Sequence, residues 1–143
     1  MTGALTEAAL FELLTLDCCV DYDGTTRYYN AQGQLHRVHG PAVDMPACYQ
    51  AWFQNGQRHR IDGPAVVYVD GYRAWYQNGQ PHRLDGPAVV NAVGACAWYQ
   101  NGLLHRLDGP AVEHEDSSYE WYIDGTALTE AEWRRIADGN YSI

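Results

Sequence analysis

One unit of 23 residues recurs along this chain without slippage, and it constrains the fold more than any other feature. The unit reads Trp-aromatic-x-Asn-Gly-x-x-His-Arg-x-Asp-Gly-Pro-Ala-Val and is followed by a variable stretch. Four units cover residues 28–125, and the tryptophan recurs at Trp52, Trp75, Trp98 and Trp121. A period of this length is typical of one supersecondary unit stacked on the next, so we expect a repeat array.

Each unit carries two turn signals, and together they predict β-hairpins. Asn-Gly, as at Asn78-Gly79, supplies two residues with positive φ, which a type I′ hairpin turn requires. Asp70-Gly71 marks the second kind of turn, half a repeat later. Asp-Gly-Pro, as at residues 85–87, interrupts strand pairing, and its proline is tolerated as the first residue of a strand. Successive hairpins would form an antiparallel meander of about ten strands. We therefore expect a mainly β fold, an elongated antiparallel β-hairpin repeat sheet with a short helix at each end.

Neighbouring aromatic residues in the unit predict two ladders on opposite faces of the sheet, because side chains alternate along a strand. The four tryptophans form one ladder, which we interpret as an aromatic core that holds the sheet together. Part of the second ladder is expected to be exposed. It consists of Phe53, Tyr76, Tyr99 and Tyr122.

Both ends of the chain carry the tetrapeptide Leu-Thr-Glu-Ala, which favours the start of a helix. Near the C-terminus, Thr129 and Glu132 fit a capping box, and a helix over residues 130–138 would end at Gly139. Near the N-terminus, a helix over residues 6–16 is expected. The predicted organisation is an N-terminal helix and cap over residues 1–17, a hairpin array over 18–125, and a C-terminal capping helix and tail over 126–143.

The chain is strongly acidic, with a formal net charge of −9 from 18 acids against nine arginines and no lysine. Nucleic acid and anionic membranes repel such a chain, which argues against direct binding to either and leaves protein partners. The acids concentrate at the ends, with five in residues 1–23 and eight in residues 113–143.

Nothing in the chain predicts export or membrane insertion. No apolar run approaches about 18 residues, and the first residues lack the bases of a secretory signal. The four cysteines lack metal-site spacing, which favours reduced thiols and a cytoplasmic protein. Cys18 and Cys19 are interpreted as a buried pair in a strand or at a helix end.

The repeated His-Arg pairs are interpreted as structural. Adjacent histidines such as His59 and His82 would lie roughly 9.6 Å apart, two strand spacings, whereas zinc ligands lie about 2.0 Å from the metal. Each histidine is expected to pack beside an aromatic ring or to bond a turn carbonyl. Each arginine, such as Arg60, can bridge the carboxylate two residues on, here Asp62, and a turn carbonyl. The alternative is a regular row of outward-facing guanidiniums that binds phosphates or acidic partners.

The Tyr-x-Asn-Gly-x-x-His pattern followed by an Asp-Gly turn resembles a MORN-type repeat. The His-Arg-x-Asp-Gly-Pro-Ala variant is similar to repeats of small phage and bacterial proteins, some of them antitoxin-like, that often end in a short helix. Here that ending is matched by residues 128–133. The resemblance covers about residues 24–136, and it implies an elongated curved sheet that serves as a binding scaffold and has no catalytic residue.

These observations predict a non-enzymatic protein-binding module without cofactor or metal. The first hypothesis is a phage- or mobile-element-type inhibitor, of the anti-defence, anti-CRISPR, antitoxin or immunity class, that blocks a target such as a nucleic-acid-processing enzyme. Its acidic surface would mimic nucleic-acid phosphates. The alternative is a structural scaffold or homo-oligomer, such as a homodimer. The predicted binding residues are Glu113, Glu115, Asp116, Glu120, Tyr72, Arg73, Tyr119, Tyr76 and Tyr99.

Overall fold

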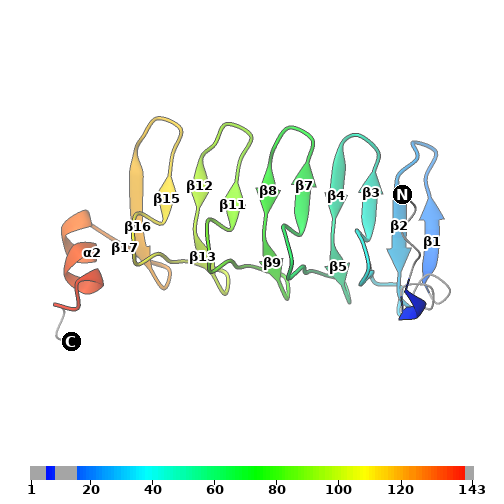
Figure 1. The fold of residues 1–143 in the computed structure, drawn as a ribbon, viewed down its shortest axis with the longest axis horizontal. Coiled ribbons are helices and arrows are strands. Elements are labelled where there is room, and N and C mark those ends of the chain that lie inside the picture. The colour runs from blue at the N-terminus through cyan, green and yellow to red at the C-terminus, as the bar shows by residue number, and fades with distance from the viewer. Residues whose placement is uncertain (1–5, 9–15, 141–143) are drawn as a thin grey trace.

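The structure, a computed structural model, describes residues 6–8 and 16–140 and consists of one long single-layer sheet (Figure 1). In this described part, 11 strands pair antiparallel in the order β1-β2-β3-β4-β7-β8-β11-β12-β15-β16-β17. They are β1 (Asp17–Val20), β2 (Thr26–Tyr29), β3 (Val43–Met45), β4 (Tyr49–Ala51), β7 (Val66–Tyr68), β8 (Arg73–Ala74), β11 (Val89–Val90), β12 (Cys96–Ala97), β15 (Val112–Glu113), β16 (Tyr119–Ile123) and β17 (Thr126–Leu128). The expected elongated antiparallel sheet is thus confirmed.

The expected continuous meander is wrong in one respect, because the Asn-Gly hairpins leave the main sheet. Their turns have the predicted positive φ, 51° at Asn78 and 77° at Gly79. Each hairpin nevertheless forms its own two-stranded unit. The three units are β5 (Phe53–Gln54) with β6 (Gln57–Arg58), β9 (Tyr76–Gln77) with β10 (Gln80–Pro81), and β13 (Tyr99–Gln100) with β14 (Leu103–Leu104).

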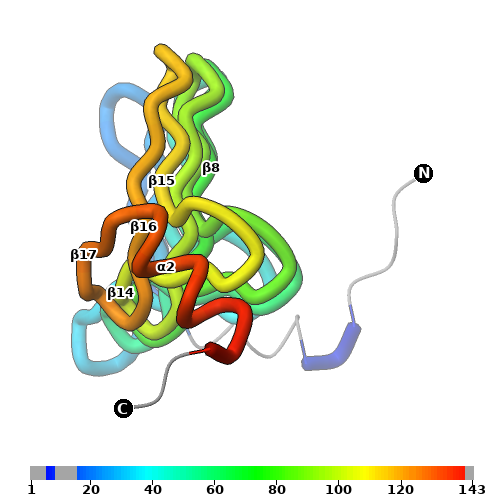
Figure 2. The backbone as a smooth tube through the Cα atoms, turned by 90° about the vertical axis from the view of Figure 1, so that its left-hand side faces the viewer, coloured from blue at the N-terminus to red at the C-terminus, as the bar shows by residue number. Residues whose placement is uncertain are grey.

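The chain departs from the main sheet at each repeated tryptophan. The Trp75 N–H donates to the carbonyl of Ala88 at 2.7 Å, and the Trp75 carbonyl accepts from the N–H of His82 at 3.1 Å. Both partners belong to the returning segment, so the strand bends out of the sheet at this point. In the view along the sheet, the small hairpins project on one side, and the loop that leads to β15 bulges on the other (Figure 2).

The proline of each unit lies in that returning loop rather than at the start of a strand. Pro64 precedes β7 by two residues, and Ala65 stands between them. Its carbonyl is free of the ladder and accepts a side-chain hydrogen bond instead, from Arg60. The Asp-Gly-Pro signal therefore marks a loop that returns the chain to the sheet.

The interior is built from alanine and valine, so the expectation of an aromatic core is wrong. Among the described residues, the buried hydrophobic side chains are Ala42, Val43, Ala51, Ala65, Val66, Ala74, Ala88 and Ala111. The tryptophans are only half-buried. A single-layer sheet has no second layer to enclose a large ring, so only small side chains between a strand and its returning loop are fully covered.

The C-terminal helix forms as predicted. Helix α2 (Glu130–Ala137) has a complete capping box of Thr129 and Glu132, and Gly139 follows it with a φ of 71°. Strand β17 extends the sheet to Leu128, so the sheet continues past the expected boundary at residue 126. The N-terminal helix expected over residues 6–16 falls mostly on residues 9–15, outside the described residues. In the described part of the chain, no helix is long and apolar enough to cross a membrane.

Candidate protein-binding surface

One face of each unit is closed by an arginine that lies on the repeated tryptophan. The Arg83 guanidinium lies 4.0 Å from the centre of the Trp75 ring. Its Nε donates to Asp85 at 2.8 Å, and its Nη1 donates to the carbonyl of Pro87 at 3.2 Å. Arg60 and Arg106 repeat this arrangement. The predicted bridge between carboxylate and turn carbonyl is confirmed, and these guanidiniums do not face outward.

The glycine of the Asp-Gly-Pro turn leaves room for this packing. A Cβ built on Gly86 would meet the guanidinium carbon of Arg83 at 2.9 Å, which is closer than real Cβ contacts. The arginine is thereby held between a tryptophan ring and a bare backbone. Because the same approach recurs at Gly63 and Gly109, the Gly-Pro-Ala motif is explained by arginine packing as well as by turn geometry.

Each repeated histidine connects its unit to the next one. The Nδ1 atom of His59 accepts the backbone N–H of Asn78 at 3.1 Å, and His82 accepts that of Asn101 at 3.0 Å. The partner is a turn N–H of the following unit, so the expectation of a bond to a turn carbonyl is wrong. In the fourth unit, His105 accepts the N–H of Asp124, whose carboxylate oxygen also lies 2.8 Å from Nδ1.

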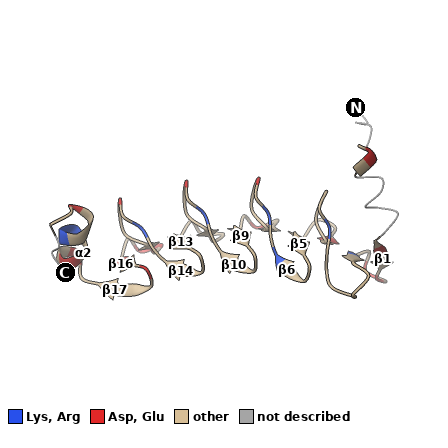
Figure 3. Ribbon diagram, turned by 90° about the horizontal axis from the view of Figure 1, so that it is seen from below, with Lys and Arg blue, Asp and Glu red and all other residues tan. Residues whose placement is uncertain are grey.

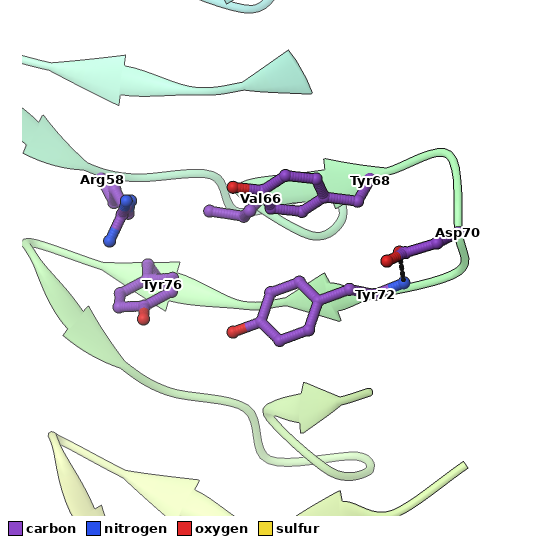
Figure 4. A pocket seen from close by; sticks show the side chains of 6 residues that line it. All are labelled: Arg58, Val66, Tyr68, Asp70, Tyr72 and Tyr76. Atoms are coloured by element: carbon purple, nitrogen blue, oxygen red, sulfur yellow. Dashed lines mark hydrogen bonds between the residues drawn. The ribbon is translucent and has the colours of Figure 1, made fainter. Parts of the chain in front are cut away.

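The opposite face carries the tyrosines and is the candidate functional site. Strand register places Tyr49 opposite Tyr68, with Val66 and Ala74 one step along the same face. Tyr72 and Tyr76 continue this face on the neighbouring strand and hairpin (Figure 4). We call this surface the tyrosine face. Its aromatic residues are Tyr49, Phe53, Tyr68, Tyr72, Tyr76, Tyr99 and Tyr122.

A cavity of about 350 Å³ lies at the middle of the tyrosine face. Tyr68, Tyr72 and Tyr76 line it, with Arg58 at one end and Asp70 at the turn at the other end (Figure 4). The Tyr68 ring contacts Tyr72 edge-on at 5.7 Å and Tyr49 at 4.6 Å.

The cavity positions its polar groups as well as its rings. Burial raises the pKa of the Tyr72 hydroxyl, so this group stays a neutral donor and acceptor. The Arg58 guanidinium lies 5.4 Å from the Tyr76 ring, where it adds a charged donor beside the apolar surface. The cavity thus offers rings, hydroxyls and a guanidinium to one ligand.

The nine residues predicted to bind a partner do not form one surface. Tyr72 lies on the tyrosine face together with Tyr76 and Tyr99, two members of the predicted second ladder. Register places Arg73, Glu113 and Tyr119 on the opposite face of the main sheet, in the row that runs through Val90 and Cys96. Comparison of the repeats shows which positions vary from unit to unit. The face on which each side chain lies follows only from the register of strand pairing.

Part of the acidic cluster is already engaged by neighbouring side chains. Glu113 pairs with Arg106 at 2.8 Å, and Glu120 pairs with His114 at 2.6 Å. Hydrogen bonds from His114 and from the Tyr122 hydroxyl lower the pKa of Glu120. Asp116 accepts from the Ser118 hydroxyl at 2.6 Å, and this bond lowers its pKa. Internal partners therefore already engage three of the four predicted acids.

Sequence reasoning missed Tyr68, Tyr49 and Arg58. The first two lie in the variable stretch between units, where the period gives no guidance. The Asp70-Gly71 turn could have indicated Tyr68, because a tight turn there pairs residue 68 with residue 72. In the structure the Tyr68 N–H donates to the Tyr72 carbonyl at 3.0 Å.

The cysteines are placed away from this cavity. Cys18 and Cys19 lie on β1 as expected for a strand, but both are exposed, so the prediction of a buried pair is wrong. Strand β1 is the outermost strand of the described sheet and pairs only with β2 there, and all four of its residues are exposed. Among the described residues, no group of three His, Cys, Asp or Glu side chains is placed to hold a metal ion.

Comparison with known proteins gives no relative from which a function could be transferred. No protein-family model matches the chain, and neither the curated proteins nor the solved structures contain a match to it. The functional argument therefore depends on the chain's own surfaces, of which the tyrosine face is the most developed.

Proposed function

We propose that this protein is a non-catalytic binding module that occupies a target protein through its tyrosine face. The observation that carries the proposal is a cavity of about 350 Å³ lined by Tyr68, Tyr72 and Tyr76, on a face of the single-layer sheet that carries further aromatic side chains. Tyrosine is enriched at protein interfaces because it combines a large rigid apolar area with a hydroxyl that can hydrogen-bond.

The scaffold suits this role because the face is fixed before a partner arrives. Tyr68 and Tyr72 are held by a tight turn, in which the Asp70 carboxylate accepts the Tyr72 N–H at 2.9 Å. Side chains that are already ordered lose little conformational freedom when they bind, which favours affinity. A partner with an apolar side chain and nearby acceptors for Arg58 matches the cavity.

We further propose that binding is inhibitory, in line with the resemblance to small phage and bacterial proteins. A module without catalytic groups acts on a target by covering its surface. The tyrosine face is a better candidate for this contact than a phosphate-mimicking acidic surface, because Glu113 and Glu120 already pair with Arg106 and His114.

The test begins with affinity capture from nuclease-treated bacterial lysate and continues with the purified partner. We expect the double variant Tyr72→Ala/Tyr76→Ala to weaken binding at least about 30-fold, the loss typical of two central aromatic contacts. The matched control is Tyr119→Ala, which removes an exposed tyrosine from the opposite face and should leave affinity within about twofold.

Charge reversal separates this proposal from acidic mimicry. Glu115→Lys/Asp116→Lys should change the affinity little and mainly alter its dependence on salt. If this variant abolishes binding while the tyrosine variant binds normally, the partner contacts the acidic loop and the proposal for the tyrosine face is wrong.

A further inference from the structure

The loops that return the chain to the sheet form a second repeating surface on the side opposite the tyrosine face. They are residues 36–41, 59–64, 82–87 and 105–110, and we call them the comb. Seen from below, they stand as parallel teeth along the molecule (Figure 3). With two strands per repeat at about 4.8 Å each, adjacent teeth are spaced by roughly 9.6 Å.

Every tooth presents one exposed aliphatic side chain at the same position, directly after the arginine of the unit. Ile61 is 78% exposed and Leu84 is 74% exposed, and Val38 and Leu107 are about half exposed. The arginine beside each of them is folded inward onto an aromatic ring, so the aliphatic side chain is the part of the tooth that meets solvent. Four equivalent exposed aliphatics in one line are unlike the scattered apolar residues of an ordinary surface.

Grooves alternate with these teeth. A groove of about 430 Å³ lies between the first two teeth, lined by Val38, Trp52 and Ile61 among others. One unit further on, a groove of about 510 Å³ is lined by the equivalent Ile61, Trp75 and Leu84. The comb therefore combines apolar projections with partly apolar hollows at one common period.

The charge of the comb indicates what can approach it. It contains four arginines against three aspartates, and each of those aspartates is paired to an arginine of its own tooth. The rest of the chain, with five arginines against 15 acids, carries the whole acidic excess. A second copy of this acidic chain meets the least repulsion here, whereas a basic partner would be drawn to the ends.

We propose that two copies of this chain associate through their combs, with the aliphatic side chains of one copy in the grooves of the other. A second copy has the same period by construction, so when the two arrays lie antiparallel and shifted by half a step, three teeth of each copy face the three gaps between the teeth of the other. Such a contact is a closed two-fold interface. The two-fold axis then runs beside either Ile61 or Leu84, next to the same residue of the other copy. This association leaves the tyrosine faces open and does not depend on the function proposed for them.

Sedimentation across a range of protein concentrations tests the proposal. The wild-type chain should pass from the 16.1 kDa monomer to a dimer. Added salt should strengthen the dimer, because it screens repulsion between two copies that each carry a charge of −9. The variant Ile61→Glu/Leu84→Glu should dimerise at least tenfold more weakly, with an unchanged far-ultraviolet spectrum and thermal midpoint. Ile61→Ser/Leu84→Ser repeats the test without added charge.

The matched control is Val69→Glu/Val93→Glu. These valines are 76% and 59% exposed and lie in the turns that connect β7 to β8 and β11 to β12, away from the comb. This variant should therefore dimerise like the wild type, apart from a small general repulsion. A wild-type chain that stays monomeric at the highest attainable concentration overturns the proposal and leaves the comb to another partner. So does a dimer that survives both comb variants, or one that the control disrupts as strongly.

Discussion

At the residue scale, the unit is organised around an arginine whose partners are supplied at fixed offsets along the chain. Arg83 meets an aspartate two residues on, a glycine three residues on and a proline carbonyl four residues on. The tryptophan eight residues earlier completes its surroundings. The Arg-x-Asp-Gly-Pro part of the motif is thus explained by the contacts of one side chain.

The first unit lacks one of these contacts, which gives a direct prediction. His39 stands where the other units have aspartate, and the Arg37 Nε is buried without a hydrogen-bond partner. We expect His39→Asp to raise the free energy of unfolding by about 0.5–1 kcal/mol, the usual contribution of a half-exposed charge-assisted bond. Urea denaturation measures this change. His39→Ala is the control, and an equal gain from it would show that loss of the imidazole, not the new carboxylate, is the cause.

The paired aspartates predict how stability depends on pH. Hydrogen bonds from Arg60, Arg83 and Arg106 lower the pKa of the three carboxyls below the usual 3.8. A carboxyl whose pKa is lower in the folded state stabilises the fold above the unfolded value, and this stabilisation is lost as pH falls through the folded value.

Denaturation of the wild type and of the triple variant Asp62→Asn/Asp85→Asn/Asp108→Asn tests this expectation. The wild type should be the more stable at neutral pH, and the difference should close as the pH is lowered beyond 3.8. A difference that stays constant down to the acid limit would mean that the ion pairs do not contribute through ionisation.

At the scale of secondary-structure elements, helix α2 ends the array by imitating a further unit. Trp52, Trp75 and Trp98 are each covered by an arginine, whereas Trp121 is covered by Trp133 at a ring separation of 4.6 Å. The Trp133 Nε1 also donates to the Arg106 carbonyl at 2.8 Å. Leu128 and Thr129 stand where the other units have His-Arg, and a helix begins after them. This helix places the Trp133 ring on Trp121, where the other units have an arginine.

Removing that ring should loosen one end of the sheet. We expect Trp133→Ala to lower the free energy of unfolding by about 2 kcal/mol, less than for a fully buried tryptophan because Trp133 is only partly buried. Hydrogen exchange should show lost protection in β16 and β17 but not in β7 and β8. The control Arg134→Ala removes an exposed pair with Glu130 and should cost only about 0.3–0.5 kcal/mol. Uniform loss of protection along the sheet would contradict this local account.

Sequence reasoning recovered several elements whose physical cause was local. The capping box at Thr129, the Asn-Gly turns and the arginine bridges all depend on residues within a few positions of one another. It failed where the cause was a pairing between distant segments. The bend at Trp75 depends on the carbonyl of Ala88, and the split of the predicted binding residues between two faces depends on a register that the period alone does not give.

At the scale of the whole molecule, the described sheet is held together by neighbours only. Each unit hydrogen-bonds to the next through the histidine, over a separation of 19 residues, and through the strand ladder. Most of the surface on both faces is consequently accessible, which is why one short chain can present a tyrosine face and a comb at once.

The histidine hydrogen bond joins each unit to the next in the same way. The structure of an interior unit therefore does not depend on how many units precede or follow it. Duplication of 23 codons would therefore insert a whole tooth, groove and hairpin in register, and the terminal tryptophan pair would close the longer product unchanged. Deletion of 23 codons would shorten the array by one whole unit. The length of the surface that this protein presents to a partner can thus evolve through the number of units, without any change to the residues within a unit.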